Sequence, residues 1–371
     1  MTFENPKESC TSPHVGAPPN PPLVSIGIVN WNNGRDLPNC LRGVFAQTHP
    51  AIEAILVDNG STDGSADWAE QTYPRLRVVR NSENLGFTRA QNRAIQMSTG
   101  AYYIPLNSDV TLEPDFVAEM VSVLEKRPDF GYASGLVYFD TDDPKCDNVI
   151  YTAGHLVVRS GLAYNRFFLR QIRRENLEEC EVGGANGACP LYRRTMLEDI
   201  AVNGEYFDDR FFLYWEDVDL DWRAHLRGWR CWFTPRAVAR HVMEATGVAG
   251  SPRGRARIAV NRWLMFIKDL EASLFFRHLP YIVKLDLSRT LPILRERPAS
   301  LLHLHKGLAG NILHSFRQRR TIQSRRRWST DQIREWLERC RVELDQGKPL
   351  RPGEVAFTRR DGRLQPENEI A

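Results

Sequence analysis

The chain lacks the features that mark disulfide-rich, metal-ribbon and membrane-spanning proteins. Its seven cysteines are scattered and include no C-x-x-C pair, which argues against a zinc ribbon or a thioredoxin-like motif. Scattered cysteines in an odd number are typical of a reducing compartment, where most of them are buried as small apolar side chains. No run approaches the ~20 apolar residues that span a bilayer. The chain does not open with a basic segment followed by an apolar core, so no signal peptide is expected. These absences predict a cytoplasmic protein.

Two common nucleotide-binding motifs are also missing. No G-x-G-x-x-G follows the first predicted strand, which weakens a dinucleotide Rossmann interpretation, and no G-x-x-x-x-G-K-[ST] is present, which excludes a usual P-loop. A strong charge imbalance is absent too, because 49 basic and 46 acidic residues leave a net charge of only +3. What remains is a chain of 371 residues, 42% hydrophobic and 26% charged. This composition is typical of a globular protein with one large domain or two ordinary ones.

Apolar runs predict four strands that alternate with helices, which indicates a parallel α/β sheet. The predicted strands cover residues 23–30, 54–58, 76–80 and 102–106, and the predicted helices include residues 37–47 and 88–98. Polar residues stand at the ends of three strands: Asn30, Asp58 and the run Asn107-Ser108-Asp109. Ligands of such sheets bind beyond the carboxyl ends of the strands. One such residue is more often part of a plain turn, but three together favour a binding site.

Five segments in a fixed order give the chain a family resemblance. They resemble the glycosyltransferase family 2 pattern on the GT-A fold, closest to its bacterial rhamnosyltransferase-like branch. The segments are VSIGIVNWN at 24–32, VDNGSTDGS at 57–65, NLGF at 84–87 with Asn92, LNSD at 106–109 and EDVDL at 216–220. The resemblance covers roughly residues 23–270. It implies an α/β fold with a Rossmann-like mixed sheet flanked by helices, here with a C-terminal helical extension.

The resemblance also implies a reaction. A sugar moves with inversion from a nucleotide-diphosphate donor to a hydroxyl of a glycan or lipid-linked acceptor, in cell-surface polysaccharide synthesis. Rhamnose from a thymidine diphosphate donor is the guess that the branch suggests. Such a transfer needs a cation against the charge of the leaving diphosphate, a base for the acceptor hydroxyl and a polar pocket for the nucleotide.

Residues on the donor side follow from the resemblance. Contacts with the nucleotide sugar are assigned to Asn30, Asp58, Asn59, Asn84, Gly86, Asn92 and Asn107. For Asp58 the alternative is a cap on the following helix. Gly86 suits a close approach of the backbone to a ligand, whereas Asn92 can equally bond a neighbouring loop.

The metal site is the point where this sequence departs from the family. Asn107-Ser108-Asp109 occupies the D-x-D position, so only Asp109 is a hard anionic ligand for Mg²⁺ or Mn²⁺. His241 stands at about the place where some GT-A enzymes complete the metal site, and a structural role for His241 is equally open.

The general base is expected in the aromatic and acidic run at residues 211–220. The resemblance assigns this role to Asp217, with Glu216 orienting it or contacting the acceptor. On a helix, Asp217 and Asp221 share a face and Asp219 points elsewhere. The alternative is that these acids only favour a helix N-terminus through its dipole. The small residues at 182–189 let a sugar approach the backbone or form a tight turn, and both interpretations stay open.

The C-terminal third is basic and amphipathic, and the whole chain divides into four parts. We expect a loose leader at 1–22, a GT-A domain at 23–270, a helical extension at 271–346 and a polar tail at 347–371. A mobile Gly- and Arg-rich loop is expected at 245–257, with Arg253, Arg255 or Arg257 near the diphosphate. Basic segments with aromatics fit peripheral attachment to the inner face of the cell membrane. The alternative is a helical extension packed on the catalytic domain; no recognition motif supports nucleic-acid binding.

A second class of function stays open at this stage. A non-catalytic module on the same fold would bind nucleotide sugars or carbohydrates without transferring them. Slow hydrolysis of a nucleotide sugar in the presence of Mn²⁺ would separate the two.

Overall fold

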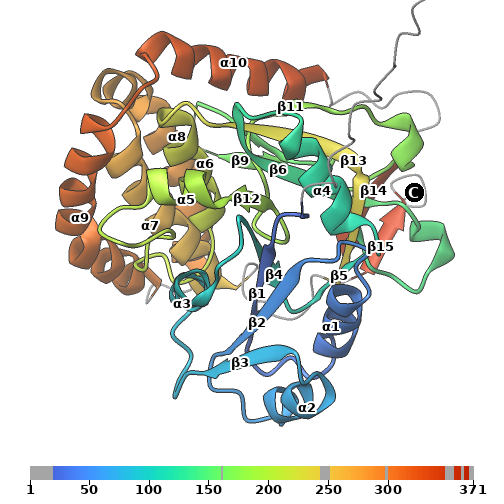
Figure 1. Ribbon diagram of the computed structural model, residues 1–371. Helices are drawn as coiled ribbons and strands as arrows, with labels where there is room; N and C mark the ends of the chain where they lie inside the picture. The colour runs from blue at the N-terminus through green and yellow to red at the C-terminus, as the bar shows by residue number, and fades with distance from the viewer. Residues whose placement is uncertain are drawn as a thin grey trace, which may run out of the picture.

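The computed structural model describes residues 20–159, 162–242, 251–296, 300–346, 355–360 and 363–366. Within them a ten-stranded sheet runs through the molecule in the order β11-β13-β6-β12-β4-β1-β2-β3, with β5 and β7 paired beside this path. Helices cover both faces of the sheet (Figure 1). In this view α7, α8 and α9 gather on the left and α10 crosses the top, away from α1 and α2.

The N-terminal half confirms the predicted parallel sheet. Its strands are β1 (Val24–Asn30), β2 (Ile52–Asp58), β3 (Leu76–Arg80) and β4 (Tyr102–Asn107). Side chains of β2 alternate between the two faces: Leu56 belongs to one core cluster and Val57 to the other. The register sets Asn30 opposite Asp58. The polar strand ends therefore lie at one edge of the sheet.

Connecting helices divide between the faces of this sheet. Leu37, Ala69 and Phe116 place α1, α2 and α4 in one core cluster, whereas the other holds residues of α3, α5 and α6. The bounds are α1 (Leu37–Phe45), α2 (Ser65–Thr72), α3 (Phe87–Met97), α4 (Phe116–Glu125), α5 (Arg194–Ile200) and α6 (Glu216–Leu226). The helices predicted at 37–47 and 88–98 are thus confirmed to within two residues.

A strand of twelve residues, β13, lies between β11 and β6 in the sheet. β13 (Arg230–His241) pairs with β6 (Phe130–Phe139), and its register shifts between Phe233 and Val238. Pro235 lies in this irregularity, where a missing N–H breaks the ladder. Beyond it the strand continues and pairs with β5 (Val110–Leu112), which sets His241 opposite Val110.

The stretch at 140–181 holds short elements. A two-stranded sheet is formed by β8 (His155–Val157) and β9 (Ala163–Asn165). Elements of two or three residues are too short for a periodic signal. The remaining elements before α5 are η1 (Pro144–Cys146), β7 (Ile150–Thr152), β10 (Arg170–Gln171), η2 (Arg174–Asn176), β11 (Cys180–Val182) and β12 (Leu191–Arg193).

The mobile loop expected at 245–257 is wrong over its second half. Residues 243–250 lie outside the described part of the chain, but α7 (Pro252–Asp269) begins at once after them. Its start is set by Ser251, whose hydroxyl accepts the Gly254 N–H at 3.0 Å, and by proline at the first helical position. Arg257 lies 4.3 Å over the Phe212 ring; the side chain of Arg253 is outside the described set.

Three further helices form the C-terminal extension. They are α8 (Ala272–Glu296), α9 (Ser300–Ser324) and α10 (Thr330–Gln346). A capping box precedes α10: the Ser329 N–H donates to Gln332 Oε1 at 2.8 Å, and the Gln332 N–H donates to Ser329 Oγ at 3.2 Å. The apolar stripe of α10 joins a core cluster with α6 and α7. One face of the extension therefore packs on the rest of the molecule.

The predicted polar tail holds secondary structure that the sequence did not indicate. β14 (Val355–Arg360) and β15 (Arg363–Pro366) pair as a hairpin, and β14 also pairs with β10. Most of the predicted leader, residues 1–19, lies outside the described part of the chain. Among the helices described, none carries an apolar stretch long enough to cross a membrane.

Candidate active site

Asn30 and Asp58 meet at the ends of β1 and β2. The Asn30 amide donates to Asp58 Oδ1 at 3.0 Å and to Ser65 Oγ at 2.8 Å. Asp58 also accepts the Ser61 N–H at 3.0 Å and the Ser61 hydroxyl at 2.5 Å. Asp58 thus holds the loop before α2, as the capping alternative expects. The buried Oδ1 of Asn30 has no hydrogen-bond partner in the described structure, so this strand end keeps an acceptor for a ligand.

Asn59, Asn84 and Gly86 join the loops after β2 and β3. The Asn59 amide donates to the Gly86 carbonyl at 3.2 Å, and Asn84 Oδ1 accepts the Gly86 N–H at 2.9 Å. Gly86 has φ of 87°, and a Cβ there would lie 2.7 Å from the carbonyl oxygen of Phe212. Glycine is required here because Phe212, in the aromatic run before α6, approaches Gly86 closely. The close contact is therefore made by the chain itself.

Asn92 is committed to another loop. Its amide nitrogen donates to Phe207 O at 2.7 Å and to Asp209 Oδ1 at 2.8 Å, and its oxygen accepts the N–H groups of Tyr206 and Phe207. Two donors and two acceptors exhaust the hydrogen-bonding capacity of an amide. The loop alternative accounts for Asn92, which has nothing left for a direct nucleotide contact.

Asp109 and His241 are brought together by the pairing of β5 with β13. His241 Nε2 lies 3.2 Å from Asp109 Oδ1, with the side chains 6% and 11% exposed. The Val242 N–H donates to the Asp109 carbonyl at 3.1 Å, which holds the two backbones in place. A carboxylate and an imidazole suit a divalent cation that accepts both oxygen and nitrogen, such as Mn²⁺, with diphosphate oxygens and water as the remaining ligands.

Asn107 lies between this pair and α6. Its N–H donates to the Ala188 carbonyl at 3.1 Å, one residue from Gly187, which contacts Asp217. Asn33, in the loop after β1, donates to Ser108 Oγ at 3.0 Å. The ends of β1, β4 and β5 and the start of α6 thus surround one region of the molecule.

Asp217 is fixed at the N-terminus of α6 by two backbone donors. Oδ2 accepts the Gly187 N–H at 2.9 Å and Oδ1 accepts the Val218 N–H at 2.8 Å. The Asp217 side chain is 15% exposed. A partly exposed carboxylate with both oxygens held in one orientation has the properties that a general base needs.

The aromatic run before Asp217 is strained and clamped. Phe212, Tyr214 and Trp215 have φ of 63°, 71° and 74°, in a region that non-glycine residues rarely adopt. Asn261 of α7 lies under the run and donates to the carbonyls of Phe211, Leu213 and Tyr214 at 3.0, 3.1 and 2.7 Å. Such strain persists only where the surroundings over-determine it, and here it fixes the position at which α6 starts.

Glu216 has a different environment from Asp217. It is buried, and its Oε2 has no partner among the described groups. Burial, together with the neighbouring charge of Asp217, raises the pKa of Glu216 to about 8. Glu216 therefore carries a proton near neutral pH.

The two remaining acids of α6 confirm the helical-face prediction. Asp219 turns away from Asp217 to pair with Arg223 at 2.9 Å and Lys268 at 2.6 Å. Asp221 shares the face of Asp217 and lies 3.0 Å from His155. The dipole interpretation thus accounts for none of the specific pairings that these side chains make.

The small residues at 182–189 make room for these acids. A Cβ on Gly184 would lie 2.0 Å from Asp221 Oδ2, and a Cβ on Gly187 would lie 3.3 Å from Asp217. The Ala185 N–H also donates to Asp221 Oδ1 at 3.1 Å. Close approach to the carboxylates of α6, rather than to a ligand, is the requirement visible at Gly184.

Tyr151, His155 and Asn186 complete the region and were missed by sequence reasoning. The Tyr151 ring lies 4.5 Å from the His241 ring. Burial is the main cause of the raised pKa of Tyr151, and the charges of Asp217 and Asp109 raise it further. Tyr151 therefore lies between the metal pair and the proposed base. Asn186 lies in the small-residue segment at 182–189, but no motif marks Tyr151 or His155, because their elements are short and their partners are distant in the chain.

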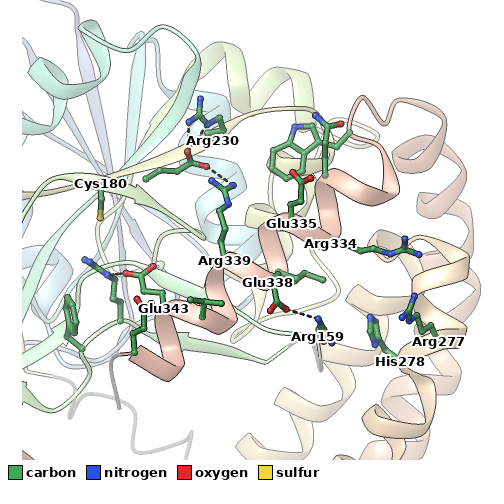
Figure 2. A pocket seen from close by; sticks show the side chains of 18 of the residues that line it. Arg159, Cys180, Arg230, Arg277, His278, Arg334, Glu335, Glu338, Arg339 and Glu343 are labelled. Atoms are coloured by element: carbon green, nitrogen blue, oxygen red, sulfur yellow. Dashed lines mark hydrogen bonds and ion pairs between the residues drawn. The ribbon is translucent and has the colours of Figure 1, made fainter. Parts of the chain in front are cut away.

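A second concavity, of about 1220 Å³, lies under α10 (Figure 2). None of its lining residues belongs to the region around Asp217. Its charged side chains largely pair across the groove, as Arg159 does with Glu338 at 2.7 Å and Arg339 with Glu181 at 3.1 Å. These pairs tie α10 to the strands beneath it.

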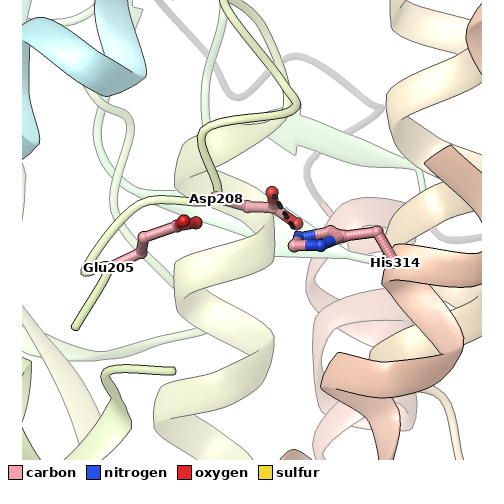
Figure 3. Close-up of side chains that lie close together, drawn as sticks. All are labelled: Glu205, Asp208 and His314. Atoms are coloured by element: carbon pink, nitrogen blue, oxygen red, sulfur yellow. Dashed lines mark ion pairs between the residues drawn. The ribbon is translucent and has the colours of Figure 1, made fainter. Parts of the chain in front are cut away.

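An acid and histidine cluster elsewhere has a structural explanation. Glu205, Asp208 and His314 lie close together (Figure 3). The ammonium of Lys268 is 2.6 Å from Asp208. Burial raises the pKa of Asp208, but the Lys268 charge and the His314 hydrogen bond outweigh it and lower this pKa. The positive charge that a metal would bring is already supplied by Lys268.

Comparisons with known proteins show that the chain is similar to glycosyltransferases. Residues 25–201 match the family described as glycosyl transferase family 2. The N-acetylglucosaminyl-diphospho-decaprenol L-rhamnosyltransferase of Mycobacterium tuberculosis is 30% identical over 249 residues, which are 61% of this chain and 78% of that protein. The poly-beta-1,6-N-acetyl-D-glucosamine synthase of Staphylococcus epidermidis is 21% identical over 68% of this chain and 57% of its own length.

Two solved structures share the fold. One is the mannosyltransferase PcManGT from Pyrobaculum calidifontis with GDP-Man and Mn²⁺, at a TM-score of 0.50 and 20% identity, covering 88% of each chain. The other is GalNAc-T7 with UDP, GalNAc and Mn²⁺, at a TM-score of 0.54 and 15% identity, covering 81% of this chain and 59% of that one. The GT-A fold expected from the resemblance is thereby confirmed.

Proposed function

This chain belongs to glycosyl transferase family 2, and on that premise we propose that it transfers L-rhamnose from a thymidine diphosphate donor to a lipid-linked acceptor. The acceptor class is suggested by the mycobacterial relative, which is named for an N-acetylglucosaminyl-diphospho-decaprenol acceptor. The observation that carries the proposal is the carboxylate of Asp217, held by two backbone donors beside the strand ends of a GT-A sheet.

The proposed reaction uses the residues of this region in sequence. Asp217 accepts the proton of the acceptor hydroxyl as its oxygen bonds to the anomeric carbon. The bond between that carbon and the diphosphate oxygen breaks, and its electron pair leaves with the nucleoside diphosphate. A single displacement of this kind inverts the anomeric centre. Glu216, protonated near neutral pH, does not compete with Asp217 for the proton.

The donor end is assigned to the strand ends. The free Oδ1 of Asn30 and the loop held by Asp58 support a contact with the nucleotide. Asn107 would face the ribose or a metal-bound water. A divalent cation at Asp109 and His241 would neutralise charge on the leaving diphosphate.

The test is transfer of labelled rhamnose from thymidine-diphospho-L-rhamnose to N-acetylglucosaminyl-diphospho-polyprenol. We expect Asp217→Asn to lower kcat by about 10²- to 10⁴-fold, because the base is lost. Donor binding, measured as the thermal shift that the donor causes, should be retained. Asp142→Asn, an exposed acid, is the matched control and should turn over normally. If Asp217→Asn turned over at near the wild-type rate, Asp217 would not be the base. If the wild type bound the donor but neither transferred nor hydrolysed it, a binding module would be favoured instead.

Membrane contact is proposed for the outer faces of α8 and α9. Their inner faces pack, but Phe276, Tyr281 and Leu287 of α8 and Leu313 and Phe316 of α9 are 52% to 69% exposed. Exposed basic residues stand among them, namely Arg277, Lys284, Arg317 and Arg320. Apolar and cationic side chains on one surface favour an anionic lipid headgroup layer. Such contact would bring the enzyme to an acceptor anchored in the bilayer.

A further inference from the structure

His155 lies directly behind Asp217 and is held from its other side by Asp221. His155 Nδ1 is 3.0 Å from Asp221 Oδ2, and His155 Nε2 is 3.8 Å from Asp217 Oδ2. Asp221 is fully buried and His155 is 4% exposed. Two carboxylates on one face of α6 thus bracket a single imidazole.

The surroundings fix the orientation of this imidazole. The backbone N–H of His155 donates to the Gly184 carbonyl at 2.8 Å, which fixes the position of the residue. Asp221 is itself held by the backbone N–H of Ala185. A carboxylate acceptor at Nδ1 keeps a proton on that nitrogen, so the second nitrogen faces Asp217. Asn186 approaches the same nitrogen at 3.5 Å. The position facing Asp217 is therefore a lone pair when His155 is neutral and a cationic N–H when it is protonated.

Building on the proposed role of Asp217, we propose that His155, held by Asp221, is a positioning residue that sets the pH range in which Asp217 acts as the base. A protonated His155 stabilises the carboxylate of Asp217 across 3.8 Å. An opposite charge at such a distance favours the charged form of a carboxylate. His155 touches no reacting atom in this arrangement.

The charges around His155 support this coupling. Burial lowers the pKa of His155, but the charge of Asp217 and the hydrogen bond and charge of Asp221 outweigh it and raise this pKa. Burial raises the pKa of Asp221 to about 6, partly offset by His155. Among the described residues, the other titratable groups that interact with the two carboxylates are Glu216 and Tyr151 near Asp217, and Tyr132, Tyr192 and Cys231 near Asp221. An acid, a phenol or a thiol supplies no positive charge, so His155 is the cation of this set.

The experiment compares the pH dependence of kcat in the full-length wild type, His155→Gln and Asp221→Asn, with the donor and acceptor named above. In both variants the acid limb of the pH profile, where kcat falls as pH decreases, should move to higher pH. The shift should be about one pH unit for His155→Gln, because loss of an opposite charge raises the pKa of a carboxylate. Activity at alkaline pH and the KM for the donor should stay within about threefold. An acid limb at the wild-type position in folded His155→Gln would overturn the proposal.

His225→Gln is the matched control. His225 is a buried histidine on the same helix, and its Nε2 lies 2.9 Å from the Gly183 carbonyl, away from Asp217. Its replacement should lower stability without moving the acid limb. If His225→Gln moves the limb as far as His155→Gln does, the effect is structural and the proposal fails.

A measurement on Asp217→Asn keeps the inference testable if the His155 variants do not fold. Loss of the Asp217 charge should lower the pKa of His155. NMR titration of labelled histidine in the wild type and the variant measures this pKa. An unchanged His155 titration would overturn the coupling. This outcome is distinct from failure of the proposed function, which is an Asp217→Asn enzyme that still transfers rhamnose.

Discussion

At the scale of single residues, acids of the same type have different states because their neighbours differ. Glu216 is buried without a partner and has a pKa of about 8, whereas Asp219 one turn away is neutralised by Arg223 and Lys268. Asp217 lies between them, with two N–H donors and a partly exposed carboxylate. Environment rather than residue type thus separates the proposed base from its neighbours.

Metal binding is tested at the same scale. We expect His241→Ala to weaken Mn²⁺ binding about 10- to 100-fold in the presence of thymidine diphosphate, because one of two protein donors is lost. Titration calorimetry with Mn²⁺ measures this directly. His278→Ala, a half-buried histidine on α8, is the control and should bind Mn²⁺ normally. Unchanged affinity of His241→Ala would assign His241 to the structural alternative.

At the scale of elements, α7 connects the catalytic face to the C-terminal helices. Asn261 fixes the strained run before α6. Lys268, about two turns further along α7, lies between Asp208 and Asp219. Burial lowers the pKa of Lys268, but the charges of these two carboxylates raise it. A helix that the sequence partly assigned to a mobile loop therefore positions the start of α6.

Removal of the buried cation should expose this dependence. Lys268→Met removes the cation that two buried carboxylates share and leaves Asp219 with Arg223 and Asp208 with His314. We expect a loss of about 3–5 kcal/mol in the free energy of unfolding. Urea denaturation at neutral pH measures it. Lys284→Met, at an exposed position of α8, should change stability by less than about 0.5 kcal/mol. The Lys268→Met deficit should shrink at low pH, because the Asp208 carboxyl, without the Lys268 charge that lowers its pKa, gains a proton there. A deficit that is absent at neutral pH would refute the assignment.

At the scale of the whole molecule, the proposed catalytic region and the exposed helices are separate surfaces of one structure. The former is built from the strand ends and α6, and the latter from the outer faces of α8 and α9 (Figure 1). α6 and α7 share a core cluster with residues of α8, α9 and α10. The sheet and the extension thus pack through a common interior.

Membrane contact is tested with vesicles. The protein should sediment with vesicles of phosphatidylglycerol and much less with phosphatidylcholine, and added salt should weaken the binding. The double variant Phe276→Ser and Phe316→Ser should reduce this binding about tenfold or more, since it removes two exposed aromatic side chains. Trp68→Ser, at a 38% exposed site on α2, is the control. Equal binding by the double variant would place any membrane contact elsewhere.

Local sequence patterns predicted the parallel half of the sheet, its polar strand ends and the arrangement of the acids on α6. Hydrophobic periodicity and helical spacing are local, so they predicted that Asp217 and Asp221 share a face. Which groups meet depends instead on the packing of segments that are distant in the chain. His155 and Asp221 are 66 positions apart in the chain, and β13 brings His241 to Asp109 only by continuing past a bulge. The same holds for Gly86 and Asn92, whose partners come from residues 206–212. Pairings between distant segments depend on strand register and helix packing, which no short window of sequence contains.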